Sequence, residues 1–316
     1  MTAKNAAGLH EDLAGALAPI IVGQAEALEE LTVALLAGGH VLFEGVPGVA
    51  KTLLAKSFAK ALALDYGRVQ FTPDLMPSDI TGTPVYLPQE GRFVLTKGPV
   101  FTELLLADEI NRTPPKTQAA LLEAMEEHQV TIGGETHQLG DTFFVVATQN
   151  PLEYEGTYPL PEAQTDRFLL KILVDYPSTE ENDRILRRHH EGFDPHDLSR
   201  VEVVADRARL AAARADADAV KVDDTLFGYL SQLVEASRTS PRVRLGASPR
   251  GGVALLRAAK ARAALMGSDF LTPDEVKSTA RPVLRHRLLL EPEAEIEGLS
   301  VDDVIGEILD EVDVPR

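Results

Sequence analysis

The stretch GVPGVAKT, residues Gly45–Thr52, decides the fold. An apolar run, HVLFE at His40–Glu44, precedes it, and a helical pattern follows from Lys51 to about Leu64. A glycine-rich turn between a strand and a helix is the setting of a phosphate-binding loop, because the N–H groups of the turn and the positive end of the helix point at one anion. The sequence therefore predicts a nucleotide-binding loop inside an α/β domain.

Each residue type in this loop has a chemical reason. Gly45 and Gly48 let the backbone approach phosphate oxygens without a Cβ in the way. Lys51 supplies a positive charge to the β- and γ-phosphates, and the Thr52 hydroxyl is a ligand for Mg²⁺. The usual pattern has glycine directly before the lysine, where this chain has Ala50; we expect this residue to begin the helix with a negative φ, which alanine tolerates. The other candidate nucleotide-binding residues of this segment are Val46, Pro47, Val49 and Leu53.

Five short apolar runs predict the strands of one sheet. They are His40–Glu44, Arg68–Thr72, Glu103–Ala107, Thr142–Ala147 and Phe168–Val174. Helical patterns lie between strands, and the runs are apolar on both faces, which is typical of a parallel sheet covered by helices on each side.

Two segments interrupt this rhythm. Pro73–Gly98 is rich in Pro, Gly and Asp and has a hairpin pattern around Gln89–Gly91. His128–Leu139 alternates around the pair Gly133-Gly134, which is a two-residue hairpin signal. We expect both segments to be insertions outside the core sheet.

From about Ser178 the pattern becomes helical. Helices are expected at about 179–190, 206–216, 225–238, 249–266, 273–287 and 301–312. We place the domain boundary near Pro177. The predicted fold class is an α/β P-loop core with a parallel sheet, residues 1–177, followed by an all-α lid domain, residues 178–316.

Two acids follow the third apolar run, in LLLADE at Leu104–Glu109. The carboxyl ends of parallel strands meet at one edge of the sheet, so Asp108 and Glu109 are expected beside the phosphate loop. We expect Asp108 to hold Mg²⁺ and Glu109 to orient or deprotonate an attacking water. An apolar run followed by Asp-Glu is weak by itself and gains its meaning from the loop that precedes it.

Three further polar positions are candidates for contact with a triphosphate. Asn150, in Thr148–Pro151 after the fourth run, is expected near the γ-phosphate. Arg167, in EAQTDRF, is of the type that reaches a neighbouring subunit's γ-phosphate. Arg250, in GASPRG at the start of a predicted helix, can reach across a cleft to phosphate.

Composition narrows the class of partner. The chain has 316 residues, a formal net charge of −18, a pI of about 4.9 and 5% aromatic residues, which argues against nucleic acid as a partner. It has no cysteine, so disulfides are excluded and a reducing compartment is compatible. No apolar run approaches the ~20 residues of a membrane span, and the first residues lack the pattern of a signal peptide. We therefore expect a cytoplasmic protein without membrane insertion.

Histidines His189, His190 and His196 raise the alternative of a metal site. The surrounding RRHH is polar and charged and has no matching set of acidic or Cys ligands, so a solvated helix face is the favoured interpretation.

The motifs together resemble one family. GVPGVAKT, LLLADEINR, ATQNP, EAQTDRF and GASPRG occur in this order, with FTPDLMPSDITG between the first two. Each motif is common among ATPases, whereas the combination resembles the MoxR family of AAA+ ATPases from about Ile20 to Leu290. Thr165 departs from the apolar residue expected at that position.

The resemblance implies a role for each motif. Val22, Gly23 and Gln24 would lie by the adenine. Lys51 and Thr52 match the Walker A pair, and Asp108 and Glu109 match the Walker B pair. Asn150 matches sensor 1, Arg167 the arginine finger and Arg250 sensor 2, which acts on either its own or the neighbouring subunit's nucleotide. Other candidates for contacts between subunits are Arg112, Arg238, Arg242 and Arg244.

The resemblance also implies an activity. Such proteins are Mg²⁺-dependent ATP hydrolases that form homo-oligomeric rings, commonly hexamers, and remodel or activate partner proteins, often ones with a von Willebrand factor A domain. Two alternatives stay open: an ATPase subunit of a magnesium-chelatase-like metal-insertion complex, and a nucleotide-binding module without turnover. The paired Asp108 and Glu109 argue against the second.

Overall fold

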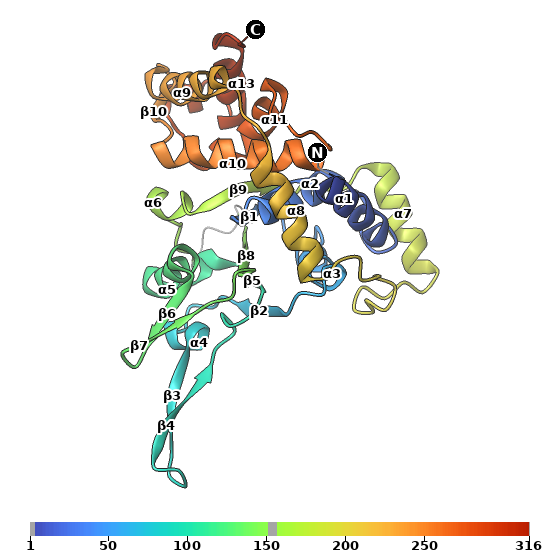
Figure 1. Ribbon diagram of the computed structural model, residues 1–316, viewed down its shortest axis with the longest axis vertical. Coiled ribbons are helices and arrows are strands. Elements are labelled where there is room, and N and C mark those ends of the chain that lie inside the picture. The colour runs from blue at the N-terminus through green and yellow to red at the C-terminus, as the bar shows by residue number, and fades with distance from the viewer. Residues whose placement is uncertain (1–3, 151–156, 316) are drawn as a thin grey trace.

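The computed structural model describes residues 4–150 and 157–315 and is built around a five-stranded sheet (Figure 1). Its strands, in spatial order, are β2 (Tyr66–Gln70), β5 (Leu104–Asp108), β8 (Phe144–Gln149), β1 (His40–Glu44) and β9 (Phe168–Leu173). All four neighbouring pairs are parallel, as predicted. The predicted strands are confirmed, with ends displaced by one or two residues at β2, β5, β8 and β9.

Alternation of side chains along each strand builds two hydrophobic cores, one on each face of the sheet. On β5, Leu104 and Leu106 belong to the core made with α1 (Lys4–Leu17), α2 (Ala25–Leu36) and α3 (Lys51–Ala61). Leu105 and Ala107 face the other core, made with α4 (Pro77–Thr81) and α5 (Pro115–Glu127). Because both faces are covered, the strands are continuously apolar.

Both predicted hairpins are present outside the sheet. β3 (Gly82–Leu87) and β4 (Arg92–Lys97) form a long antiparallel pair that extends away from the body of the molecule (Figure 1). β6 (Gln129–Ile132) and β7 (Glu135–Gln138) form the second pair. Its turn residues, Gly133 and Gly134, have φ of 61° and 89°, which is the left-handed backbone that a tight hairpin turn requires.

The second half of the chain is helical, with six predicted helices confirmed and ends that differ by up to three residues. They are α7 (Thr179–His190), α8 (Arg207–Ala219), α9 (Asp224–Thr239), α10 (Pro249–Leu265), α11 (Pro273–Leu284) and α13 (Val301–Glu311). The sequence did not predict α1, the short α12 (Pro292–Ile296), the small η1 (Ile110–Arg112), or the strands β10 (Val243–Leu245) and β11 (Leu289–Leu290), whereas the helical turn expected before Arg167 is present as α6 (Glu162–Thr165). Within the described ranges, no helix is both long and apolar enough to cross a bilayer.

Arg287 connects the helical half to the sheet. Its side chain is 3% exposed, and its Nε donates to Asp166 Oδ1 at 2.6 Å. Its Nη2 donates to the Phe168 carbonyl at 2.6 Å and its Nη1 to the Leu169 carbonyl at 3.1 Å. A planar guanidinium carries several N–H donors, so this one side chain can donate hydrogen bonds to both carbonyls at the start of β9 and to Asp166. The end of α11 is thereby held against the start of β9.

His40, the first residue of β1, makes folding stability depend on pH. Its Nδ1 accepts from the Val145 N–H, and its Nε2 donates to the Met125 carbonyl, both at 3.1 Å. Burial of the ring lowers the pKa of His40 from 6.5 to about 4. The unfolded chain therefore takes up a proton below pH 6.5 while the folded chain does so only near pH 4, and stability is lost as pH falls through this window.

We expect the free energy of unfolding to fall by about 2 kcal/mol because of His40 when the pH is lowered from 7.5 to 5. Urea unfolding of wild type and His40→Gln at both pH values measures it. The variant should be less stable at pH 7.5 but should lose less on acidification. An equal loss in the two proteins would remove His40 as the cause.

Candidate active site

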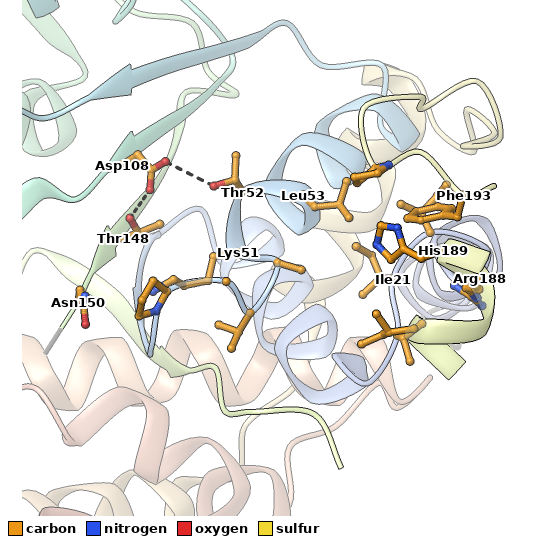
Figure 2. A pocket seen from close by; sticks show the side chains of 18 of the residues that line it. Ile21, Lys51, Thr52, Leu53, Asp108, Thr148, Asn150, Arg188, His189 and Phe193 are labelled. Atoms are coloured by element: carbon orange, nitrogen blue, oxygen red, sulfur yellow. Dashed lines mark hydrogen bonds between the residues drawn. The ribbon is translucent and has the colours of Figure 1, made fainter. Parts of the chain in front are cut away.

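A cavity of about 490 Å³ lies at the carboxyl edge of the sheet, between the loop after β1 and the helix α7 (Figure 2). That volume is within the range of small-molecule sites. The cavity has a polar end, formed by Thr52, Asp108, Thr148 and Asn150, and an apolar end near Ile21, Leu53 and Phe193 (Figure 2). A ligand with a charged group at one end and a flat apolar group at the other fits this division.

The loop between β1 and α3 forms one wall of the cavity, through Pro47, Gly48, Val49 and Ala50. A Cβ on Gly45 would lie 2.2 Å from the Val174 carbonyl oxygen, so only glycine fits there. Gly48 has φ of 86°, which turns the loop back toward α3. Gly45 and Val46 belong to this loop but are not among the residues that line the cavity.

Lys51 and Thr52 are the first two residues of α3 and both line the cavity. The Lys51 Nζ donates to the Gly45 carbonyl at 2.6 Å. Burial lowers the pKa of Lys51, against the opposing effect of Asp108, Glu109 and Glu44. The ammonium group is therefore only partly hydrated, which makes it a good partner for a phosphate anion.

Ala50 corrects a sequence-based expectation. Its φ is 62° and its ψ is 19°, so the residue is left-handed and precedes the helix instead of starting it with a negative φ. The loop alternates handedness here to turn successive N–H groups into the concave side, and this requirement overrides the preference of alanine. The position still accepts alanine because its side chain is exposed.

We expect Ala50→Gly to leave the unfolding free energy unchanged or raise it by up to about 1.5 kcal/mol. Relief of the left-handed backbone contributes about 1–2 kcal/mol, and the greater freedom of glycine in the unfolded chain offsets about 0.4–1 kcal/mol of this. The matched control is Ala211→Gly, an exposed interior position of α8, which should lose about 1 kcal/mol. Urea unfolding without nucleotide compares them, and equal losses would contradict the left-handed geometry.

Asp108 ends β5 and is 8% exposed. Its Oδ1 accepts from the Thr148 hydroxyl at 2.6 Å, and its Oδ2 lies 3.4 Å from the Thr52 hydroxyl. The Arg68 guanidinium, on β2, donates to the same Oδ2 at 2.8 Å. The strand register brings Arg68, Asp108 and Thr148 together, because β2, β5 and β8 are adjacent parallel strands whose carboxyl ends lie at the same level.

Glu109 follows Asp108 and has φ of 58°. Its N–H donates to the Thr148 hydroxyl at 2.8 Å, so one hydroxyl connects both acids. Its carboxylate accepts from Gln70 at 2.7 Å and pairs with Arg112 at 3.3 Å. A left-handed backbone conformation is strained for glutamate and persists only because the surrounding structure holds it. Such strain is typical of functional positions.

Asn150, after β8, is 7% exposed and lines the polar end of the cavity (Figure 2). Its carbonyl accepts from the Asn111 side chain at 3.5 Å. Pro151, the last residue of that motif, lies outside the described residues. The structure thus places Asn150 in the same cavity as Asp108 and Thr148.

The apolar end takes its walls from two distant segments. Ile20, Ile21 and Val22 come from the turn before α2, and Ile185, Arg188, His189, Phe193 and Pro195 come from α7 and the loop after it. The His189 and Phe193 rings meet edge to face with centroids 5.8 Å apart. Val22 lines the cavity, but Gly23 and Gln24 do not: Gly23 packs closely on Glu181, and Gln24 occupies the N-cap position of α2.

Arg167 and Arg250 lie elsewhere. Both line a second cavity of about 180 Å³, and none of the described residues lines both cavities. Arg167 directly precedes β9, whose first residue pairs in register with His40, the first residue of β1. The phosphate loop follows the last residue of β1, so a strand of roughly 13 Å separates the two. Neither arginine lines the first cavity of its own chain.

The polar end suits a magnesium ion. Thr52 and Asp108 present hard oxygen atoms on one wall, which is the ligand type that Mg²⁺ prefers. Mg²⁺ at nucleotide sites needs one or two protein oxygens, and phosphates and water supply the rest. The described residues contain no group of three or more His, Cys, Asp or Glu placed to hold a metal, so the histidines around His189 give no support for a separate metal site.

Comparison with known proteins identifies the family. Residues 40–170 match the ATPase family associated with various cellular activities (AAA), and residues 235–308 match the AAA lid domain. The protein named Chaperone MoxR1 of Mycobacterium tuberculosis is 44% identical over 306 residues, covering 94% of this chain and 80% of that protein. The chain belongs to the MoxR family of AAA+ ATPases. The YeaC protein of Bacillus subtilis is 46% identical over 296 residues, covering 94% of this MoxR-family chain and 92% of YeaC.

The MoxR-family fold is also that of a solved structure. A crystal structure of a candidate ATPase from Cytophaga hutchinsonii superposes with a TM-score of 0.89 and 39% sequence identity, covering 99% of this chain and 98% of that one. The α/β core with a parallel sheet and the helical AAA lid are therefore confirmed.

Sequence reasoning missed several residues of this MoxR-family site. Thr148, Arg68 and Gln70 contact the two acids, and His189 and Phe193 form the apolar end. Thr148 had a usable signal, because it ends a strand beside Asp108 and carries a hydroxyl. Arg68 and Gln70 had a weaker one, the alternation that puts both on the same face of β2. No local sequence signal indicates that α7 folds back onto the cavity.

Proposed function

We propose that this protein hydrolyses ATP with Mg²⁺, acting on the phosphoric anhydride bond. One observation carries the proposal: Asp108 and Glu109, at the end of β5, meet Thr52 and the phosphate loop in a single cavity. The apolar end of the same cavity supplies a surface for a purine, with Val22, Ile21 and Phe193 around it. Lys51 and the loop N–H groups would bind the phosphates.

The residues of the chain divide the chemical work. Thr52 and Asp108 would hold Mg²⁺, which when bound neutralises charge on the phosphates. Glu109 accepts the proton of the attacking water, and Asn150 orients that water or the γ-phosphate. Thr148 fixes both acids through one hydroxyl. Arg68 and Gln70 hold the two carboxylates in the absence of ligand.

We infer that the active unit is a homo-oligomeric ring, with six subunits as the expected number. Arg167 and Arg250 lie away from their own nucleotide cavity, at the start of β9 and of α10. If either arginine stabilises a γ-phosphate, it therefore does so for the nucleotide of the adjacent subunit. This arrangement makes hydrolysis depend on assembly.

The proposed role is chaperone-like remodelling or activation of a partner protein in the cytoplasm. The similarity to a protein named Chaperone MoxR1 supports the general role. The family resemblance supplies the partner class, a protein with a von Willebrand factor A domain. Capture of partners on Glu109→Gln subunits held in the ATP state tests this, with capture on ADP-bound wild type as the comparison.

A crystal structure with a non-hydrolysable ATP analogue and Mg²⁺ tests the site itself. We expect the triphosphate on the loop, the ion between Thr52 and Asp108, and the base at Ile21 and Phe193. Phosphate-release assays on the same preparation test turnover, with Lys51→Ala as the inactive control. An analogue bound far from Asp108 and Glu109 would overturn the proposal.

A further inference from the structure

Glu126 pairs with both of the arginines that lie outside the nucleotide cavity. It is the penultimate residue of α5. Its Oε2 lies 3.0 Å from Arg167 Nη2, and its Oε1 lies 3.1 Å from Arg250 Nη2. One carboxylate thus joins three elements: α5, the segment between α6 and β9, and the start of α10.

The pairing holds two like charges side by side. The oxygens of a carboxylate share one carbon atom, so the two guanidinium groups that they bind must be close together. Without Glu126, Arg167 and Arg250 would repel each other and their long side chains would separate. Each arginine gives one terminal nitrogen to Glu126. A guanidinium has five N–H donors, so donors remain for a second anion.

Fold stability does not account for the arrangement. The side chains of Glu126, Arg167 and Arg250 are 33%, 28% and 48% exposed. Ion pairs with that exposure contribute little to folding because solvent screens them. By contrast Arg287, in the same cavity, is 3% exposed and fully engaged with Asp166 and backbone carbonyls, as a structural arginine should be.

The cavity around Glu126 suits an anion from another molecule. Arg167, Arg250, Arg257 and Arg287 line it together with the carboxylates of Glu126 and Asp166. Four cations against two anions leave a net positive charge in the cavity lining, and Arg167 and Arg250 are partly exposed members of the set. A terminal phosphate with two negative charges matches this excess and can bind two guanidinium groups at once.

We propose that Glu126 is a positioning residue that presents Arg167 and Arg250 as one unit to the terminal phosphate of the nucleotide in the adjacent subunit. This inference rests on the proposed function, because it requires ATP hydrolysis at a subunit interface. Glu126 itself touches no nucleotide in its own chain, since it lies outside the nucleotide cavity. Its effect passes through the two arginines, one from the sheet and one from the helical domain.

The first test separates rate from affinity. Glu126→Ala should lower kcat roughly 10- to 100-fold, because misplaced arginines stabilise the transferring phosphate poorly. KM for ATP should change less than about twofold, because the loop of the same subunit binds the nucleotide. Glu127→Ala, which removes the same charge one residue later at an exposed position, is the matched control and should behave as wild type. A wild-type kcat in Glu126→Ala would overturn the proposal.

The second test places the change in one subunit of a mixed ring. Glu109→Gln subunits cannot use their own ATP but keep their arginines, and Arg167→Ala subunits keep their own cavity. Mixing the two should restore hydrolysis at interfaces where Arg167 of a Glu109→Gln subunit contacts the ATP bound by an Arg167→Ala subunit. Adding Glu126→Ala to the Glu109→Gln subunit should lower the restored activity by the same roughly 10- to 100-fold, and adding it to the Arg167→Ala subunit should leave the restored activity unchanged.

The outcomes are distinguishable. If the parent mixture recovers no activity, the role of Arg167 between subunits fails, and this inference fails with it. If the parent mixture recovers but Glu126→Ala acts equally in either subunit, only the inference is overturned. Light scattering verifies that each mixture assembles, and Glu126→Gln, which keeps the side-chain size, replaces Glu126→Ala wherever the alanine variant does not assemble.

Discussion

Glu109→Gln will bind ATP with near wild-type affinity and turn it over about 10²–10⁴-fold more slowly, which is the range that a positioned general base contributes. The glutamine keeps the size of the side chain and cannot take the proton of a water molecule. Binding should persist because the loop, Lys51 and the apolar end of the cavity remain intact. Phosphate release under saturating ATP and titration of a fluorescent ATP analogue measure the two quantities.

Glu123→Gln is the matched control for this prediction. It makes the same chemical change on the exposed side of α5, away from the cavity. The control should retain wild-type turnover. Steady-state turnover at the wild-type rate in Glu109→Gln would remove Glu109 from the role of base.

Arg167→Ala will fold and assemble but lose about 10³-fold or more in turnover, since an arginine supplied to a transferring phosphate contributes about 10³–10⁵. Among residues 4–150 and 157–315 it has one ion pair, with Glu126, which is partly exposed and is worth at most about 1 kcal/mol to folding. Arg167→Lys should recover little, because an ammonium group lacks the planar fork. Phosphate release and light scattering on the same samples give both results.

Dilution of the wild type is the independent check. Specific activity should fall as the ring dissociates, and Arg167→Ala should be inactive at every concentration. A dilute monomer that hydrolyses ATP as fast as the assembled protein would show that the guanidinium does not act between subunits.

The core of the site was predictable from sequence because its chemistry lies in contiguous residues. The loop at Gly45–Thr52 and the acids at Asp108 and Glu109 have short-range patterns, and parallel strands bring their ends to one edge. The backbone of Ala50 was predicted wrongly, since the direction of its N–H group depends on the curve of the loop and not on helix propensity.

The remaining contacts depend on tertiary structure. Arg68 reaches Asp108 only because β2 pairs with β5 in one particular register. His189 reaches the cavity only because α7 folds back beside Ile21, as Figure 2 shows. Glu126 meets Arg250 across 124 positions of sequence, a pairing that no local pattern contains.

The hydrogen bonds of Arg287 connect the helical half of the chain mechanically to the segment that carries Arg167. They tie the end of α11 to Asp166, whose chain neighbour is Arg167, while Ser248 at the start of α10 donates to the same Asp166 at 3.0 Å. Tension applied to these helices by a bound client would therefore be transmitted to Arg167, the guanidinium that we propose acts on the next subunit's nucleotide. The force that a client exerts on one subunit would then change the rate of ATP hydrolysis in the adjacent subunit.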